Sequence, residues 1–383
     1  MFLKKIAEQN PLLLAYAFSL HRKGEILPDS YVLDLDSIME NAQQILSCAK
    51  EHRISLYFML KQLGRNPLIG KRLQKLGFGA AVCVDYREAL LYIRHGIRLG
   101  HVGHLTQIPT AALPAIVEAE PEVITVYSIE KARQIASLAR QANRCQPILL
   151  RVTEPQDYIY PGQKAGFTLS ELPNVVHEIK QIDGVIVEGL TAFPCFTFSD
   201  MQYQLTPNAR TLQTAADMLR QLGVEIHQIN MPSASCCDTL PRIAQAGGTH
   251  AEPGHGLTGT TPLHAYSICP EKPALVYVSE VMHHFDNHSY CLGGGNYARG
   301  HMQSAMVGER FDQCDTVSMT PPPAGNIDYH FELQGIFPIG STVLSAFRTQ
   351  IFHTRSQVVV VEGLSNGNPR ILGVYSAQGE RIG

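Results

Sequence analysis

The 383-residue sequence has no block of like charge, and its formal net charge is −3. The charge pattern therefore gives no indication of a nucleic acid or a membrane surface as partner. It also has no apolar run long enough to span a bilayer. Residues 1–23, where a signal peptide would lie, carry Asn10 and Pro11 ahead of their apolar run and no small-residue cleavage site after it. We therefore expect a surface-packed helix pair there and no membrane partner.

The nine cysteines form no disulfide framework, because they are odd in number and scattered, with one adjacent pair at Cys236-Cys237. This usage fits a reducing compartment, and we expect a cytoplasmic protein. Hydrophobic residues make up 45% of the chain, enough for a sizeable core. The length predicts one large domain and a smaller partner domain.

Apolar, β-branched runs alternate with helical patterns from about residue 54 to residue 252. Strands are expected at residues 54–61, 79–84, 100–105, 122–127, 147–152, 185–190, 224–230 and 249–252. Helices are expected at 67–76, 86–95, 108–119, 128–140, 169–182, 207–222 and 238–246. The first strand is followed by QLGRNP and not by the G-x-G-x-x-G turn of a doubly wound sheet. The repeat therefore predicts an α/β fold, a (β/α)8 TIM barrel.

The helical periodicity ends after residue 259. Short strands are expected at 274–282, 304–307, 342–352, 357–362 and 370–375, and residues 316–326, with three consecutive prolines, are expected to form a loop. The predicted domains are 1–50, N-terminal helices and a strand (31–35) that joins the β domain; 51–258, the barrel; and 259–383, a C-terminal β domain.

Candidate chemistry is expected at the C-terminal ends of the barrel strands. Lys61 ends the first predicted strand after mostly apolar residues, where partial desolvation would lower its pKa and favour Schiff-base chemistry. A lysine that reaches solvent at a strand end explains the position equally well. The loop after strand seven, MPSASCC, contains Ser233 and Ser235, and the stretch after strand eight, HAEPGHGLTG, contains Gly254 and Gly256. Small residues at these two places predict a site for a phosphate-bearing cofactor.

The combination of a strand-end lysine, a serine-rich loop and EPG resembles the fold-type III pyridoxal-phosphate enzymes. These include alanine racemases, D-threonine aldolases, D-serine dehydratases and ornithine- or diaminopimelate-type decarboxylases. The resemblance covers almost the whole chain. Several segments are most similar to the YhfX-type proteins of the racemase branch: YFMLKQLGRNP, GHLTQIP, YPGQKAGF, PSAS, THAEPGHGLTGT and YCLGGGNYARGH.

The resemblance implies pyridoxal 5'-phosphate (PLP), held as an aldimine on Lys61. It places Glu252 at the position that faces the pyridine nitrogen, where alanine racemases carry an arginine. A carboxylate there keeps the ring protonated and strongly electron-withdrawing. The phosphate-binding positions implied by the resemblance are Ser233, Ser235, Gly254 and His255.

The second acid-base group departs from the family pattern. Alanine racemases use a tyrosine of the partner subunit's β domain, within a motif resembling SYGGTY, but Leu292 falls near that position here. Cys291, Tyr297 and Tyr290 remain candidates, because each can ionise or donate a proton. Packing residues of a glycine-rich strand are the alternative interpretation of all three.

Several other polar residues are possible site residues. His283, His284 and His288, with Cys291 and His301, show no established ligand spacing, so no metal is predicted. His104 lies at the functional end of the barrel and is a candidate for the cofactor pocket, as is Gln107. Arg65 and Asn66 follow Lys61 and could reach the cofactor or a substrate carboxylate, although a solvent-facing helix start fits them equally well.

The sequence therefore predicts a PLP-dependent enzyme acting at Cα of a small amino acid, an isomerase of the racemase or epimerase type. Lyase chemistry (dehydratase, aldolase or decarboxylase) and a non-catalytic PLP carrier are the alternatives. The resemblance also implies a homodimer, in which the β domain of one subunit completes the active site of the other.

Overall fold

The computed structural model describes all 383 residues and divides into two compact units. The barrel unit comprises Ile45–Met59 and Gly70–Gly254. The β unit comprises Met1–Gln44, Leu60–Ile69 and His255–Gly383.

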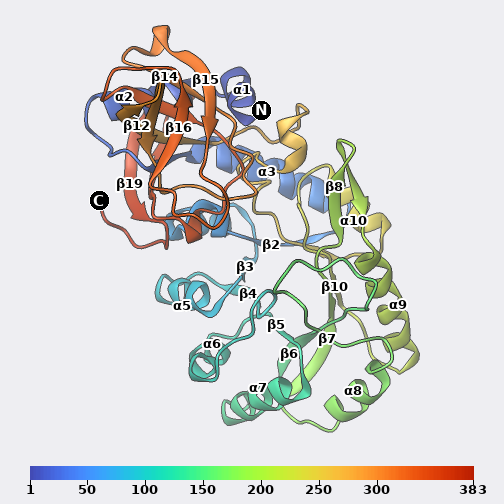
Figure 1. Cartoon of the computed structure of the whole chain (residues 1–383). Helices are drawn as coiled ribbons and strands as arrows, with labels where there is room; N and C mark the ends of the chain where they lie inside the picture. The colour runs from blue at the N-terminus through green and yellow to red at the C-terminus, as the bar shows by residue number, and fades with distance from the viewer. The chain divides into compact units, whose positions relative to one another are not determined.

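The barrel unit contains a closed barrel of parallel strands in the order β10-β11-β2-β3-β4-β5-β6-β7, which confirms the predicted TIM-like fold (Figure 1). Its strands are β2 (Ser55–Phe58), β3 (Ala80–Cys83), β4 (Leu99–Val102), β5 (Val123–Val126), β6 (Gln146–Arg151), β7 (Val185–Thr191), β10 (Gln228–Asn230) and β11 (His250–Ala251). The helices of this part of the chain are α3 (Leu35–Glu51), α4 (Pro67–Leu76), α5 (Tyr86–Arg94), η2 (Thr110–Ala112), α6 (Leu113–Glu118), α7 (Ile129–Gln141), α8 (Leu172–Ile179), α9 (Pro207–Gln221) and α10 (Thr239–Gln245).

Local sequence explains these elements. Strands β3 and β5 are buried along their whole length, because a parallel barrel strand is covered on both faces, and they are accordingly continuous apolar runs. Helix α7 begins where Ser128 Oγ accepts a hydrogen bond from Lys131 N at 3.3 Å. Asp85 caps α5 in the same way, through Glu88 N at 3.0 Å.

A short antiparallel hairpin, β8 (Phe196–Ser199) and β9 (Gln202–Leu205), follows β7 and was not predicted from the sequence. Its turn residues Asp200 and Met201 both have positive φ, at 50° and 59°. Two left-handed residues give the turn a twist that matches paired strands. Neither residue is glycine, so the usual sequence signal of such a turn is missing.

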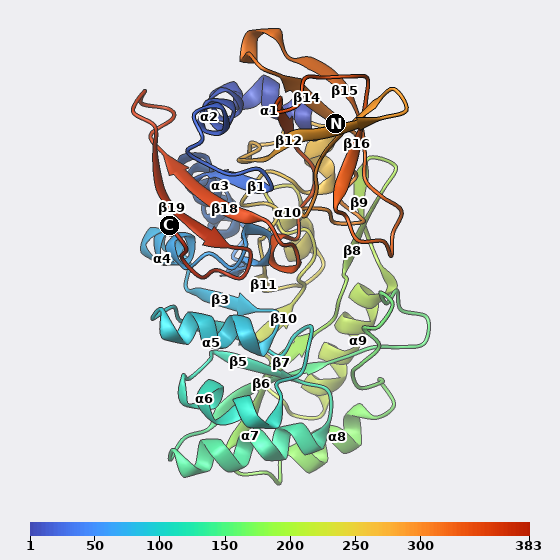
Figure 2. The same ribbon diagram turned by 60° about the vertical axis from the view of Figure 1, so that its left-hand side comes forward.

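The β unit is built on a nine-stranded sheet in the order β13-β16-β15-β14-β17-β12-β1-β18-β19 (Figure 2). Its strands are β1 (Ser30–Asp34), β12 (Leu275–Phe285), β13 (His288–Leu292), β14 (Ser304–Gly308), β15 (Asp315–Thr320), β16 (His330–Gln334), β17 (Thr342–Ser345), β18 (Gln357–Glu362) and β19 (Arg370–Ser376). The helices are α1 (Phe2–Gln9), α2 (Pro11–Arg22), η1 (Lys61–Leu63), η3 (Pro262–Ala265), η4 (Phe311–Gln313) and η5 (Ile351–His353).

Strand β1 lies between β12, to which it is antiparallel, and β18, to which it is parallel. The apolar faces of α1 and α2 pack in one core with this sheet, through residues such as Leu13, Val276 and Val359. The predicted loop at 316–326 is wrong over its first part, because residues 315–320 form β15. A polar segment followed by three prolines has the composition of a loop. Residues 315–320 nevertheless form a strand, because they pair with β14.

No helix combines the length and the apolar content that crossing a bilayer requires.

Candidate active site

Glu252 is the centre of a buried polar network at the C-terminal end of the barrel. It directly follows β11, and its side chain is fully buried. Its Oε1 lies 2.6 Å from His101 Nδ1 and accepts a hydrogen bond from Asn230 Nδ2 at 2.8 Å. His101 belongs to β4 and Asn230 to β10. The network therefore joins three strands through the barrel interior.

Hydrogen-bond accounting fixes the tautomer of His101. Its Nε2 lies 2.5 Å from Thr125 Oγ1, and this is the hydrogen bond that the buried Thr125 hydroxyl makes. A buried hydroxyl hydrogen needs an acceptor, so Thr125 donates to Nε2. Nδ1–H then donates to Glu252, and Asn230 Nδ2, which lies 3.1 Å from His101 Nδ1, donates to the same carboxylate oxygen.

The second carboxylate oxygen, Glu252 Oε2, is buried and has no hydrogen-bond partner in the structure. An unmade hydrogen bond on a buried charged acceptor is costly, which favours a ligand that donates a hydrogen there. An aromatic N–H, such as that of a protonated pyridine ring, meets this requirement. The residues present therefore fit the cofactor implied by the sequence.

The predicted phosphate loop lies next to this network. Ser235 Oγ accepts a hydrogen bond from Glu252 N at 3.0 Å, and Ser233 Oγ accepts one from Cys195 N at 2.7 Å. Both hydroxyls therefore keep a hydrogen that can be donated to an anion. Ala234 between them has a φ of +47°, which turns the backbone sharply. Gly254, two residues after Glu252, is also buried.

His104 is buried in a row of aromatic rings at the same end of the barrel. Its ring centroid lies 5.0 Å from that of His101 and 5.6 Å from that of Phe193, and the Phe193 ring lies 5.7 Å from Tyr160. The rings of this row are tilted or edge-on to one another, and the row begins at His101 of the Glu252 network. Gln107 instead braces the backbone, because its Nε2 donates to Gly103 O and Thr125 O at 3.0 and 2.9 Å.

In the β unit, Lys61 begins the short helix η1, three residues after β2 ends, and is half-buried. Thr349 Oγ1 donates to the neighbouring carbonyl, Gln62 O, at 3.1 Å. His255 is buried, and its Nε2–H donates to Thr349 O at 2.8 Å. Burial, then the charges of Arg348 and Lys61, hold the pKa of His255 well below its usual value. His255 is therefore neutral and can offer an anion its backbone N–H but no charge.

The residues after Lys61 have structural contacts. Asn66 caps α4, since its Oδ1 accepts from Leu68 N and Ile69 N at 3.0 and 3.2 Å. Arg65 is buried, its Nη1 donates to Gln378 Oε1 at 2.7 Å, and its guanidinium lies 4.8 Å from the Phe352 ring centre. Asn66 is thus accounted for by the helix start.

The candidates for the second acid-base group differ in environment. Cys291 is fully buried in β13, and burial raises the pKa of its thiol to about 12. Tyr297 is half-buried, and its hydroxyl accepts a hydrogen bond from Arg299 Nε at 3.1 Å. Tyr290 donates to Glu332 Oε2 at 2.9 Å, and this bond raises its pKa.

The histidines considered as metal ligands make separate contacts in the β unit. His283 stacks on the Tyr290 ring at 5.0 Å, His284 Nε2 lies 2.6 Å from Phe337 O, and His288 Nδ1 lies 2.8 Å from Asp286 O. No group of three or more His, Cys, Asp or Glu side chains is arranged to hold a metal ion.

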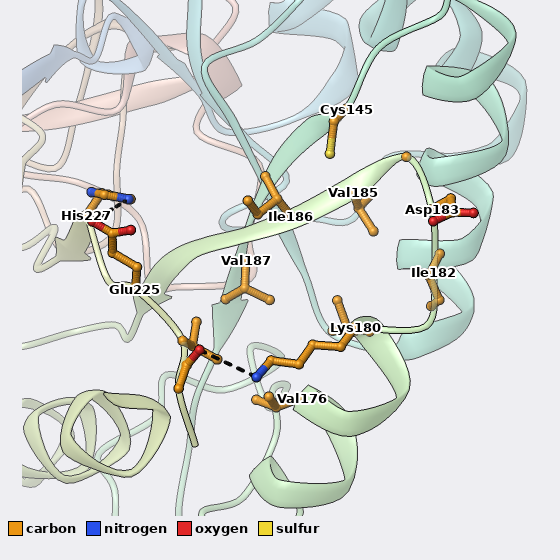
Figure 3. A pocket seen from close by; sticks show the side chains of 14 residues that line it. Cys145, Val176, Lys180, Ile182, Asp183, Val185, Ile186, Val187, Glu225 and His227 are labelled. Carbon is orange, nitrogen blue, oxygen red and sulfur yellow. Dashed lines mark hydrogen bonds and ion pairs between the residues drawn. The ribbon is translucent and has the colours of Figure 1, made fainter. Parts of the chain in front are cut away.

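A separate cavity of about 450 Å³ lies at the opposite, N-terminal end of the barrel strands (Figure 3). Val185, Ile186 and Val187 of β7 line it, together with Lys180 and with Glu225 and His227 before β10. Lys180 Nζ donates to Leu222 O at 2.9 Å. Because the active sites of such barrels lie at the C-terminal end, we do not place the chemistry in this cavity.

Sequence reasoning found Glu252 and the serines but assigned no role to His101, Asn230 or Arg151. Arg151 is a charged residue that ends the otherwise apolar strand β6, and this signal was present in the sequence. The hydrogen bonds of His101 and Asn230 to Glu252 form only when the barrel closes. A local sequence pattern therefore cannot reveal them.

Comparisons with known proteins agree with this architecture. Residues 33–262 match the model of the alanine racemase N-terminal domain, and residues 276–371 match the model of the YhfX-like C-terminal domain. The uncharacterized protein YhfX of Escherichia coli (strain K12) is 44% identical over 386 residues, covering 100% of both chains.

Solved structures share the fold at low sequence identity. A D-threonine aldolase from Filomicrobium marinum has a TM-score of 0.66 and 17% identity, over 91% of this chain and 95% of that chain. Alanine racemase of Clostridium difficile 630, in complex with cycloserine, has a TM-score of 0.65 and 15% identity, over 92% and 99%. D-threo-3-hydroxyaspartate dehydratase from Delftia sp. HT23 has a TM-score of 0.64 and 14% identity, over 90% and 97%. The barrel, the β domain and the full-length relative lead to one conclusion: the chain belongs to the alanine racemase N-terminal domain family, in its YhfX-like branch.

Proposed function

We propose that this chain is a PLP-dependent enzyme that acts at Cα of a small amino acid, as a racemase or epimerase. The observation that carries the proposal is the buried Glu252, whose Oε1 is held by His101 and Asn230 while Oε2 has no partner. This arrangement would leave one carboxylate oxygen for the N–H of a pyridinium ring. When bound, PLP would supply an electron sink for the electron pair that proton removal leaves on Cα.

The chain's own residues have separable roles in this proposal. Lys61 would hold the cofactor covalently and, when released by the substrate amine, would take or return the α-proton through Nζ. Glu252 would keep the proton on the ring nitrogen. Ser233 and Ser235, with the backbone at Gly254 and His255, would bind the phosphate. The rings of His104 and Phe193 would exclude water from one side.

Tyr297 is the residue we propose for the opposite face of Cα, where a second proton donor is needed for inversion. Its side chain is half-buried, and its hydroxyl accepts a hydrogen bond from Arg299. The thiol of Cys291, in contrast, is buried, and burial raises its pKa to about 12. At neutral pH the Cys291 thiol holds its proton and is a weak base. Cys291 therefore stays the second choice.

The experiment that tests the function follows the α-proton. The purified protein is treated with borohydride and mapped by mass spectrometry, and a panel of amino acids is then incubated with it in deuterated water. We expect cofactor fixed on Lys61 and deuterium exchange with inversion for at least one small amino acid. Cofactor on another lysine, or none, would refute the cofactor assignment. Retention of the cofactor without α-proton exchange for any amino acid would identify a carrier protein.

A lyase reaction is the second candidate function. The observation that favours it is the carboxylate of Glu252 at the position where alanine racemases carry arginine. A strongly electron-withdrawing ring supports loss of a β-hydroxyl group or cleavage of the Cα–Cβ bond as well as proton exchange. Assays with D- and L-3-hydroxy amino acids, measuring 2-oxo acid, ammonia and aldehyde, separate the two candidates.

We also propose a homodimer in which residues 290–301 of one copy close the active site of the other. The support is the family membership and the position of Tyr297 in that segment. Mixing Lys61→Ala with Tyr297→Phe subunits should then restore part of the activity, because a mixed dimer contains one intact site. No restoration between subunits shown to exchange would refute the shared site.

A further inference from the structure

A segment of three glycines and Asn296, residues 293–296, leads from β13 to Tyr297 in the β unit. The structure requires each glycine, because an added Cβ atom would lie within 2.5 Å of another residue. These distances would be 2.1 Å to Asp328 O at Gly293, 2.0 Å to Asp29 Oδ2 at Gly294 and 2.5 Å to Tyr277 Cε2 at Gly295. The main chain is therefore packed closely against its neighbours up to the residue before Tyr297.

Every residue of this segment also makes a main-chain hydrogen bond. Three of these bonds join neutral groups: Gly293 N to Tyr329 O at 2.8 Å, Arg355 N to Gly294 O at 3.2 Å, and the Tyr31 hydroxyl to Gly295 O. The fourth bond has a carboxylate acceptor, because Asn296 N donates to Asp328 Oδ2 at 2.9 Å. A hydrogen bond to an ionised acceptor is roughly twice as strong as one between neutral groups. Asp328 thus provides the strongest anchor, and it does so directly before Tyr297.

Asp328 is itself oriented by Arg355. The Asp328 side chain is 12% exposed, and its Oδ1 accepts a hydrogen bond from Arg355 Nη2 at 2.9 Å. The same nitrogen donates to Asp328 O at 3.1 Å. One carboxylate oxygen therefore faces the guanidinium, and the other faces the main chain of Asn296.

The side chain of Tyr297 has few contacts of its own that could fix it. Its ring lies edge-on to the ring of His353, with the centroids 5.5 Å apart. Its hydroxyl accepts a hydrogen bond from Arg299, which is exposed and lies two residues further along the chain. Arg299 would move together with Tyr297, so it cannot fix the phenol. The place of the phenol therefore depends on the anchor at Asn296.

We propose that Asp328 is a positioning residue of the active site. Its carboxylate, oriented by Arg355, holds the main chain at Asn296 and thereby sets the place of the Tyr297 phenol. Proton transfer needs close contact between donor and acceptor, and a displacement of about 1 Å can slow a reaction about 10²-fold. The inference rests on the proposed function, in which Tyr297 transfers the second proton. It adds a residue to which the sequence assigned no role.

Two variants of Asp328 and one matched control test this role. Asp328→Ala removes both side-chain hydrogen bonds, whereas Asp328→Asn keeps an amide oxygen for Asn296 N. Asp312→Ala is the control, because Asp312 is a 66% exposed aspartate of the same unit that pairs with Arg310 at 3.2 Å. For each protein, kcat and KM are measured for inversion of a small amino acid, together with cofactor retention and the rate of α-proton exchange without inversion.

The expected results separate a positioning role from a general loss of structure. Asp328→Ala should lower kcat for inversion at least about tenfold and leave KM and cofactor retention unchanged. Exchange without inversion, which needs only Lys61, should stay within about twofold. Asp328→Asn should recover most of the lost rate, and the control should match the wild type. An unchanged kcat in Asp328→Ala would overturn the inference.

A double-mutant cycle shows whether Asp328 acts through Tyr297. If it does, Asp328→Ala has no further effect on the residual inversion of a Tyr297→Phe protein, because the group that it positions is already absent. Losses that add in the double variant would show that Asp328 affects the whole domain, and the positioning role would be refuted.

Amide hydrogen exchange tests the anchor without added cofactor. Each protein is placed in deuterated water, and its peptides are followed by mass spectrometry. In Asp328→Ala, residues 293–299 should exchange at least about tenfold faster than in the wild type, while the rest of the β unit is unchanged. Arg355→Gln should show a smaller increase. Because the Arg355 side chain is 54% exposed, this variant covers the case in which Asp328→Ala does not fold.

This measurement also separates the inference from the proposed function. Equal exchange of residues 293–299 in the wild type and in both variants would refute the anchor, whether or not the protein takes up PLP at Lys61. A wild type that inverts no amino acid would refute the proposed function, and with it the role of Asp328 in proton transfer, even if the anchor itself is found.

Discussion

The two ends of the barrel each carry a histidine–glutamate pair, in opposite environments. At the C-terminal end, His101 Nδ1 lies 2.6 Å from Glu252 Oε1, and both side chains are 0% exposed. At the N-terminal end, His227 Nε2 lies 3.6 Å from Glu225 Oε1, and the side chains are 53% and 84% exposed (Figure 3). The residue types are the same, and the two pairs differ in burial and in the distance between the nitrogen and the oxygen.

The contrast shows that folding stability can explain the exposed pair but not the buried one. An exposed pair contributes at most about 1 kcal/mol and costs little to form, so the His227–Glu225 pair needs no further explanation. A buried ion pair costs several kcal/mol to desolvate, and replacing both partners with apolar residues of similar size is often neutral for stability. Glu252 also leaves one oxygen unsatisfied. A ligand that completes its hydrogen bonds explains this arrangement better than folding does.

The largest expected effect is that of Glu252→Gln. If the carboxylate holds the ring proton, losing a charge pair worth about 3 kcal/mol slows α-proton exchange by about 10²-fold. Cofactor retention should change much less, because the phosphate contacts and the bond to Lys61 remain. Exchange is measured in deuterated water beside the control Glu225→Gln, which we expect to stay within twofold. Equal rates in wild type and Glu252→Gln would show that this carboxylate is structural.

The sequence was sufficient for most of the fold. The barrel strands are buried on both faces and therefore read as continuous apolar runs such as AAVC and VITV, separated by amphipathic helices with recognisable caps. The β8–β9 hairpin, β13, β15 and β16 were missed, because most of their residues are polar or the turn lacks a glycine. Such strands form because neighbouring strands pair with them, and this is a tertiary effect.

The site could be predicted only in part, for a related reason. Glu252, Ser233 and Ser235 lie in short motifs of small residues, which indicate that the backbone approaches a ligand closely. His101 lies in β4, three positions away from β11 in the barrel order, and meets Glu252 only across the closed interior. Arg151 can be recognised as buried and unpaired only when the loop at residues 163–165 is in place.

The next effect in size concerns His101, whose Nδ1–H donates to the buried carboxylate. His101→Ala removes a charge-assisted hydrogen bond, worth roughly 2–3 kcal/mol, and leaves the Thr125 hydroxyl without its acceptor. We expect the free energy of unfolding in urea to fall by about that amount. His227→Ala, from the exposed pair, should change it by about 0.5 kcal/mol or less. A similar loss in both variants would remove the distinction between the two ends.

Acid conditions should reveal a further, partly buried histidine of the barrel unit. Burial, with a smaller contribution from His101, lowers the pKa of His250 to about 4. Below pH 6.5 the unfolded chain then binds a proton that the folded chain does not, so stability falls as the pH is lowered toward 4. Between pH 7 and pH 5 this amounts to about 2 kcal/mol.

The measurement compares wild type with His250→Gln in urea at the two pH values. We expect the wild type to lose about 2 kcal/mol more than the variant over this interval. His227→Gln, which removes an exposed histidine, should lose as much as the wild type. The assignment is wrong if His250→Gln retains the full pH dependence.

The smallest effect is expected at Ile186, which lines the N-terminal cavity and is 53% exposed. Ile186→Thr keeps the β-branched shape that β7 favours and exchanges apolar for polar surface that already faces water. We expect a change in unfolding free energy of about 0.5 kcal/mol or less and α-proton exchange within twofold of the wild type. The matched control is Val187→Thr on the next residue of the strand, where the side chain is 8% exposed and a buried hydroxyl costs about 1–3 kcal/mol. If Ile186→Thr slowed exchange while its stability stayed normal, the N-terminal cavity would be coupled to the chemistry, and the two ends of the barrel would have to be treated as one functional unit.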